Sequence, residues 1–282
     1  MKGDSYIQKA NGSLVLFNRE KLVGSLVRSG AKENQANSIA DEIEINLVHG
    51  MKTQKIYQKA FKLLRSGNRP AASNYQLRRA VMDLGPSGYP FEHLVSAIFR
   101  HQGYEVKTGV IMQGMCVTHE VDVFAENKYE VRFIECKFHN QPGVKSDVKI
   151  AMYVNSRVID LKKRWLKDHP DEKRTITGGL VTNTKLTEDA RIFASCSGIM
   201  GIGWDTPHKI ALLDKLTEMR LLPITLIPSL TKREREEIVK EGIVLCRELV
   251  NAEDQLKNTL IERYRIEKLI AEAKEVMNHF EL

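Results

Sequence analysis

The stretch "HEVDVFAENKYEVRFIECKF", residues 119–138, constrains the fold of this chain more than any other segment. Two largely apolar runs flank a short polar segment, and this pattern predicts two strands joined by a turn. Asp122, Glu135 and Lys137 nevertheless stand among valine, isoleucine and phenylalanine. Burial of a charge without a partner is strongly unfavourable. The strands are therefore expected to carry these charges out to the edge of a core.

Helix and strand patterns alternate on both sides of this hairpin. The segment "FEHLVSAIFRHQG" has helical apolar spacing and ends at Gly103. Further helices are expected at 145–168 and 187–197, and strands at 104–112, 119–126, 131–138, 177–183 and 199–205. This order predicts an α/β sandwich with a mixed sheet flanked by helices.

The first third of the chain has a different pattern. Residues 6–17 read as a β-hairpin around Asn11-Gly12, the dipeptide that a type I′ turn prefers. Asn18 is a suitable N-cap for a helix that ends near Ser29. Further helices are expected at 33–48, 54–66 and 70–83, and the Gly-Pro-Ser-Gly-Tyr-Pro run at 85–90 reads as a linker.

The segment after Asp205 is predicted to be nearly all helical. Thr231 and Glu234 have the spacing of a capping box, and one or two helices are expected over 254–280. A helix–hairpin–helix around Gly242 and a dimerisation or packing role are both open for this segment. The fold class is therefore α/β, in an α+β multi-domain chain, with domains at 1–85, 90–206 and 207–282.

Composition narrows the classes of partner. The chain has 282 residues and a net charge of +7, and residues 1–90 hold 14 Lys and Arg against 7 Asp and Glu. A basic module attracts polyanions, although a solvated basic face explains the same counts. Four cysteines without a C-x-x-C pair predict neither a zinc site nor a disulfide framework. No apolar run reaches the roughly 20 residues of a membrane span, so we expect a cytoplasmic protein with no membrane partner.

Two lysines of the basic first module could form a phosphate cradle. Lys9 precedes the Asn-Gly turn, and Lys21 lies in the first turn of the next helix, whose N-terminus favours anions. Solvated lysines explain the same spacing. No G-x-x-x-x-G-K-[ST] motif occurs in the chain, so a P-loop ATPase is excluded.

The contexts "IQKANGSLVLFNREKL" and "MKTQKIYQKAF" contain Ile7, Lys9, Gly12, Phe17, Lys21 and Thr53, and Tyr75 follows them in the chain. With these residues, positions 5–83 resemble the ATP-cone, the nucleotide-sensing module of many ribonucleotide reductases and of a related transcriptional repressor. The resemblance implies that Lys9 and Lys21 hold phosphates of ATP or dATP. It also implies that Ile7 packs on the base and Thr53 contacts it. Tyr57, in the place of a common His, belongs to the expected site.

The hairpin charges can also be assigned a chemistry. Residues two apart on a strand share a face, so Glu135 and Lys137 lie together, and the hairpin can bring Asp122 beside Glu135. Two adjacent carboxylates suit Mg²⁺, which takes oxygen ligands and keeps waters, and the Cys136 carbonyl could add one oxygen. Lys137 would then face a metal-bound water. A structural salt bridge from Lys137 to either carboxylate is the alternative for the isolated residues.

The motifs "HEVDVF" and "FIECKF", the helix "FEHLVSAIFRHQGYEV" and the later "GGLVTNTKLTEDARIFASCSGIMGIGWD" resemble the PD-(D/E)xK nuclease fold, and within it the Mrr-like restriction endonucleases. The resemblance spans residues 90–206. It implies a Mg²⁺ or Mn²⁺ site held by Asp122 and Glu135, with Glu92 assisting and Lys137 activating water. The basic run at 161–174 either touches a DNA backbone or is a solvated helix end.

The sequence as a whole therefore predicts a nucleotide-regulated, metal-dependent DNA endonuclease. Its expected partners are DNA and a nucleotide, together with further copies of the chain in a homo-oligomer. One alternative is a catalytically silent DNA-binding regulator that responds to ATP or dATP. Another is a nucleotide sensor that controls assembly only.

Overall fold

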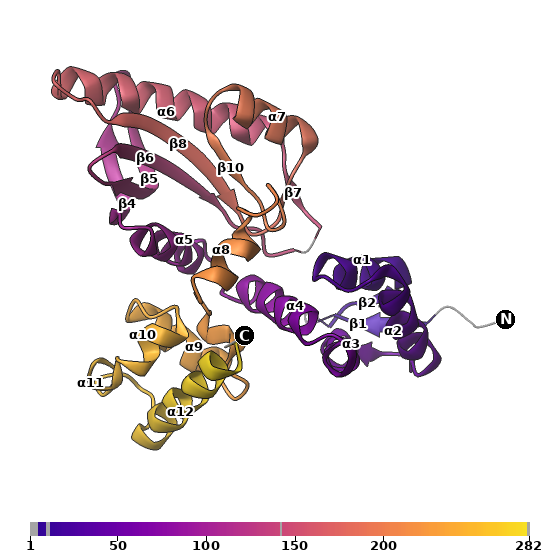
Figure 1. Ribbon diagram of the computed structural model, residues 1–282. Helices are drawn as coiled ribbons and strands as arrows, with labels where there is room; N and C mark the ends of the chain where they lie inside the picture. Colours follow the sequence, from indigo (N-terminus) through magenta and orange to yellow (C-terminus); the bar gives the residue numbers. More distant parts are fainter. Residues whose placement is uncertain (1–4, 10–11, 142, 281–282) are drawn as a thin grey trace. The chain divides into compact units, whose positions relative to one another are not determined.

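The structure of the chain, a computed structural model, describes residues 5–9, 12–141 and 143–280. It divides into two compact units, Met1–Arg79 and Ala80–Leu282. The division falls within a helix, ahead of the Gly-Pro-Ser-Gly-Tyr-Pro run. Both units contain helices and strands (Figure 1).

The first unit combines a small sheet with helices. The predicted hairpin is confirmed, since β1 (Tyr6–Gln8) and β2 (Leu14–Leu16) pair antiparallel. Asn11 of the expected turn lies outside the described residues. A two-residue strand, β3 (Met51–Lys52), pairs parallel with β1 and was not predicted. The helices are α1 (Arg19–Arg28), α2 (Glu33–Ile45), α3 (Thr53–Gly67) and α4 (Arg69–Met82).

Local sequence explains where α1 begins and ends. The Asn18 side chain accepts a hydrogen bond from the Lys21 backbone N–H at 2.7 Å, which satisfies one of the unpaired donors of the first turn. Gly30 has a φ of +99°, a conformation that glycine adopts without a steric penalty. Leu22 and Leu26 on the inner face of α1 are buried in the core of the unit.

The second unit is built on the mixed sheet that the sequence predicts. Its strand order is β10-β8-β6-β5-β4. The strands β4, β5 and β6 are antiparallel neighbours, whereas β8 runs parallel to β6 and β10 runs parallel to β8. Their bounds are Glu105–Gln113 for β4, Thr118–Glu126 for β5, Glu130–Lys137 for β6, Thr175–Thr182 for β8 and Met200–Ile202 for β10. A second, unpredicted sheet pairs β7 (Lys145–Ser146) with β9 (Lys185–Leu186).

Helices cover both faces of this sheet. The long helix α6 (Val148–Asp168) and α7 (Glu188–Cys196) lie on one face, and α5 (Tyr89–His101) lies on the other (Figure 1). Phe124 and Phe133 of the sheet pack with Val154, Val158 and Leu161 of α6 in a buried cluster. The predicted α/β class with a mixed sheet is thus confirmed. The strands β5 and β6 lie between the helix layers.

The remainder of the second unit is helical, as predicted. The elements are α8 (Leu212–Glu218), the 3₁₀ turn η1 (Ile224–Leu226), α9 (Lys232–Lys240), α10 (Cys246–Val250), α11 (Glu253–Leu256) and α12 (Arg263–His279). Thr231 and Glu234 form the expected capping box at the start of α9. Arg265 of α12 donates to the Glu234 carboxylate at 2.6 Å and ties the two helices together. Over the described residues, every helix is too short or too polar to cross a bilayer.

Candidate active site

The strands β5 and β6 separate at Asp122. Their pairing ends where Val123 lies opposite Ile134. Beyond that point the Cys136 backbone N–H donates to the Asp122 carboxylate at 2.7 Å, so a side chain takes the place of a ladder partner. Glu135, the residue before Cys136, therefore lies next to Asp122, as the hairpin pattern predicts.

Four carboxylates lie close enough to interact electrostatically at this end of β6. Burial, and then the charges of Asp122, Glu120 and Glu135, together raise the pKa of Glu92 to about 7. Burial is also the main cause of the raised pKa values of Asp122 and Glu135. Asp122 raises that of Glu135, and the Cys136 N–H moderates that of Asp122. Like charges held close together disfavour ionisation, so this cluster would gain from a bound cation.

Arg157 of α6 is the cation that these acids already have, and sequence reasoning missed it. Its guanidinium donates to the Glu135 carboxylate and to the Glu120 carbonyl oxygen. The available signal was its place on α6, three residues after Val154 and four before Leu161, on the buried stripe of the helix. A charged residue at an inward position of a helix calls for a partner.

Lys137, the last residue of β6, has its side chain in solvent. It lies opposite Thr182 of β8 and is exposed. Within residues 5–9, 12–141 and 143–280 it takes part in no ion pair, so the salt bridge considered from sequence is absent there. Its charge still lowers the pKa values of Asp122 and Glu135. An ammonium group that is close to the acids and free to move suits a role in handling water or phosphate.

The donor set at this site fits a magnesium-type ion in part. The structure places Asp122 and Glu135 as two adjacent carboxylates, and Mg²⁺ typically uses one or two carboxylates with waters completing its shell. The described residues contain no group of three or more His, Cys, Asp and Glu side chains arranged around a metal position. Burial raises the pKa of the Cys136 thiol well above its usual value, so only its backbone carbonyl could serve as a ligand.

The two histidines near the site have structural partners. His119 Nε2 lies 2.8 Å from Asp160 Oδ2 on α6, and Asp160 also accepts from the Cys116 backbone N–H at 2.9 Å. These bonds hold the β4–β5 turn against α6 and lower the pKa of Asp160 to about 2. His139 Nε2 lies 3.0 Å from the Ser146 hydroxyl. Both rings therefore serve local packing.

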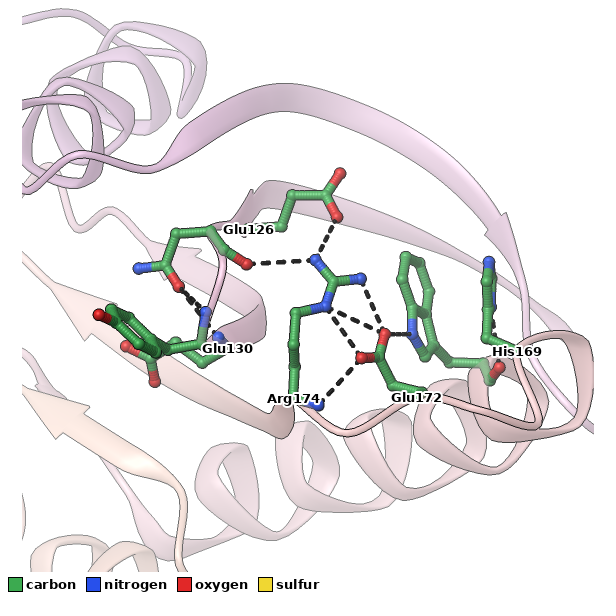
Figure 2. A network of polar contacts seen from close by, with 8 residues as sticks. Glu126, Glu130, His169, Glu172 and Arg174 are labelled. Atoms are coloured by element: carbon green, nitrogen blue, oxygen red, sulfur yellow. Dashed lines mark hydrogen bonds and ion pairs between the residues drawn. The ribbon is translucent and has the colours of Figure 1, made fainter.

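The basic run at 161–174 is partly used inside the unit. Figure 2 shows Arg174 bound to Glu126 and to Glu172, with distances of 3.0 and 2.8 Å from its Nη1 and Nη2 atoms. Glu172 also accepts from the Trp165 indole N–H at 2.9 Å. His169 stacks on Trp165 with ring centroids 4.4 Å apart. Trp165 and Arg174 thus fasten the end of α6 to the start of β8, and these two are not free to meet DNA.

In the first unit, Ile7 lies on β1, and Thr53 is the first residue of α3, directly after β3. Ile7 is only 8% exposed and belongs to the core, so little of it is open to a base. The Thr53 hydroxyl donates to the Gln8 carbonyl oxygen at 2.8 Å and joins the start of α3 to β1. Lys9 follows β1 and Lys21 lies on α1, and both are exposed.

Tyr57 lies one turn after Thr53 on α3. Its ring stacks on that of Tyr75 from α4, with centroids 4.9 Å apart and planes 16° apart. The Arg79 guanidinium lies 4.9 Å from the centre of the Tyr57 ring. Burial raises the pKa of Tyr75 to about 12, although Arg79, Arg28 and Arg78 favour its ionised form. This part of the unit therefore combines stacked aromatic rings with several guanidinium groups.

Comparisons with known proteins place the chain beside archaeal relatives. A family model described as AF1548-like, C-terminal, matches residues 222–277. An uncharacterized protein of Archaeoglobus fulgidus is 37% identical over 184 residues, which make up 65% of this chain and 99% of that protein. The crystal structure of the protein of unknown function AF1548 is 38% identical, with a TM-score of 0.58 over 68% of this chain and 99% of that one.

Proposed function

This chain belongs to the AF1548-like family, and we propose that it is a metal-dependent DNA endonuclease whose activity responds to a nucleotide. In this proposal residues 90–206 have the PD-(D/E)xK, Mrr-like fold, and residues 1–85 form an ATP-cone. Residues 207–282 form a helical domain that packs or dimerises. The expected partners are DNA and ATP or dATP, with association of copies as one response to the nucleotide.

The observation that carries the proposal is the meeting of Asp122 and Glu135 at the point where β5 and β6 part. Burial, together with the neighbouring carboxylates, raises the pKa of Glu92 to about 7, and such perturbed groups are common in functional clusters. Lys137 is the last residue of β6 and is exposed to solvent. Arg157 pairs with only one of the four acids, Glu135, so negative charge remains in excess at this strand end beside the exposed Lys137.

In the proposed site Asp122 and Glu135 would hold Mg²⁺ or Mn²⁺, with Glu92 supporting them. The ion, when bound, would lower the pKa of a water molecule and neutralise charge on a phosphodiester. Lys137 would orient the attacking water and stabilise the charge that develops on the phosphate. Arg157 would keep the Glu135 carboxylate in one orientation, as groups behind a metal ligand commonly do.

The first unit would act as the nucleotide sensor. Lys9 directly follows β1, Lys21 lies in the first turn of α1, and both are exposed. A helix N-terminus with nearby lysines suits phosphate binding. The base would lie near Thr53, with Tyr57 as an aromatic neighbour. Because Ile7 is nearly buried, we expect only its edge to meet the base.

The experiment that tests the enzyme combines cleavage and binding. Supercoiled plasmid is incubated with the full chain and Mg²⁺ or Mn²⁺, with and without ATP or dATP. The proposal expects nicking that EDTA abolishes and that Asp122→Asn abolishes, while DNA binding by Asp122→Asn persists. An inactive wild-type chain under all of these conditions would exclude the endonuclease.

A second candidate is supported by one specific contact. Arg157 already neutralises Glu135, and this would suit a catalytically silent DNA-binding regulator that keeps the nuclease fold. Such a protein would bind DNA in a nucleotide-dependent way without cleaving it. The same experiment separates the two functions, because the regulator binds plasmid and leaves it supercoiled.

A further inference from the structure

A cavity of about 490 Å³ lies between α5 and the sheet, with α8 beside it. Val95 and Phe99 of α5 form one wall, and Val181 of β8 and Ile202 of β10 form another. The cavity exists because α5 packs on β4, β5 and β6. The part of this sheet face formed by β8 and β10 is therefore less covered. The volume is in the range of pockets that bind small molecules, and seven of the twelve lining side chains are apolar.

Two cationic side chains line this apolar cavity. Arg132 of β6 points to the α5 side, since its neighbours Val131 and Phe133 are in the core on the α6 side. Its Nη2 atom donates to Glu130 at 2.7 Å. Its Nε atom is buried and has no hydrogen-bond partner among the described residues. The side chain as a whole is 23% exposed, so part of the guanidinium can be reached from the cavity that it lines.

Lys215 of α8 is the second cation. It is half-buried, and over the residues that the structure describes it forms no ion pair. Burial lowers its pKa, and Arg132 lowers it as well, although Glu218 and Asp214 act in the opposite direction. Glu130 can neutralise one of the two cations that line the cavity. Because Glu130 pairs with Arg132, the Lys215 ammonium group is the cation without an ion-pair partner among the described residues that line this cavity.

We propose that this cavity binds a small molecule with an aromatic or aliphatic body and one anionic group, which Arg132 and Lys215 hold. The body would fill the space between Phe99, Val181 and Ile202. The anion would accept from the accessible N–H groups of the Arg132 guanidinium and from the Lys215 ammonium group. This site lies beside β8 and β10, and none of the four clustered carboxylates lines it, so it differs from the candidate active site at the end of β6.

The test measures binding of two fluorescent probes, which share the same N-phenylnaphthylamine body, to the full chain. 8-Anilino-1-naphthalenesulfonate carries one anionic group, and N-phenyl-1-naphthylamine lacks it. We expect the anionic probe to bind with a stoichiometry of one at this site. Lys215→Met should weaken its binding about tenfold, the effect of losing roughly 1.4 kcal/mol from a charge-assisted contact. Binding of the neutral probe should change less than twofold.

Two further variants keep the test decisive. Lys149→Met removes an exposed lysine from the far face and should leave binding of both probes unchanged. Ile210→Trp adds bulk at the exposed rim of the cavity and should weaken both probes without disturbing the core. The proposal is overturned if Lys215→Met leaves the anionic probe unaffected, if Lys149→Met weakens it as much, or if Ile210→Trp weakens neither probe.

Discussion

The Arg157 guanidinium donates a hydrogen bond to the Glu135 carboxylate, and the two residues are 22 positions apart in the sequence. The contact joins α6 to the end of β6, where Asp122 and Glu92 also lie. Their side chains are largely shielded, with 14% of Arg157 and 23% of Glu135 exposed. Arg157 therefore sets how much repulsion remains among the carboxylates.

Removal of Arg157 should expose that repulsion. Arg157→Met leaves the Glu135 carboxylate without its partner, and we expect a loss of about 1–3 kcal/mol in the free energy of unfolding at pH 8. Urea denaturation measures it. Arg164→Met on the same helix breaks an exposed pair with Asp168 and should cost less than about 1 kcal/mol. Equal losses in the two variants would show that the Arg157 contact stabilises the fold no more than an exposed ion pair does.

Glu92 should make stability depend on pH in the direction opposite to an ordinary paired carboxylate. Its folded pKa is about 7, whereas the ordinary value is 4.5. The folded state therefore binds the proton more tightly, and the stability that this gives is present below pH 4.5 and is lost as the pH rises through 7.

Glu92→Gln tests this sign. Glu92 is partly exposed, so after allowance for solvent we expect a gain of roughly 1 kcal/mol, or about 2–4 °C in Tm, at pH 8.5. Little difference is expected at pH 5, where the wild-type carboxyl is protonated. Glu105→Gln, on an exposed position of β4, is the control. A Tm difference for Glu92→Gln that is the same at both pH values would contradict the repulsion.

The network in Figure 2 should show the ordinary direction. Hydrogen bonds from Arg174 are the main reason that the pKa of Glu172 lies well below its usual range. The stability from this pair is present above the usual carboxyl pKa and is lost as the pH falls through the folded value. Arg174→Met should therefore lower the Tm at pH 7, and the difference from wild type should shrink below about pH 4. A constant difference down to pH 2 would argue against the ion pair as the cause.

The nucleotide site gives a separate prediction. A Lys9→Ala, Lys21→Ala double variant should reduce ATP affinity by at least tenfold, because each charged contact to phosphate contributes about 1.5–3 kcal/mol. Isothermal titration calorimetry measures the affinity. A Lys59→Ala, Lys62→Ala variant removes two exposed charges from α3 in the same unit and should bind ATP as wild type does. Unchanged binding in the Lys9 and Lys21 variant would refute the phosphate role.

Much of the fold was predictable because strand and helix periods dominate this sequence. The hairpin of β5 and β6 follows from two apolar runs, and it placed Asp122 beside Glu135 correctly. The strands β3, β7 and β9 were missed because two residues are too few to show a period, and their pairing depends on partners far along the chain.

The rest of the site depends on tertiary packing. The inward position of Arg157 on α6 could have been read from the sequence, but its partner could not, since the crossing of α6 over β6 sets it. The Arg174 contact to Glu126 could not be predicted, because Glu126 lies on β5, 48 positions away in the sequence. The cavity beside Arg132 has no sequence signal, because it arises from how far α5 extends over the sheet.

The most direct measurement is the initial rate of plasmid cleavage by Lys137→Ala in Mg²⁺ or Mn²⁺, compared with Lys107→Ala. Lys107 is an exposed lysine on β4 of the same sheet and serves as the matched control. We expect Lys137→Ala to cleave at least 100-fold more slowly than wild type, as loss of a group that handles the reacting proton predicts, while Lys107→Ala keeps full activity and both variants bind DNA. Cleavage by Lys137→Ala at the wild-type rate would contradict the proposed function.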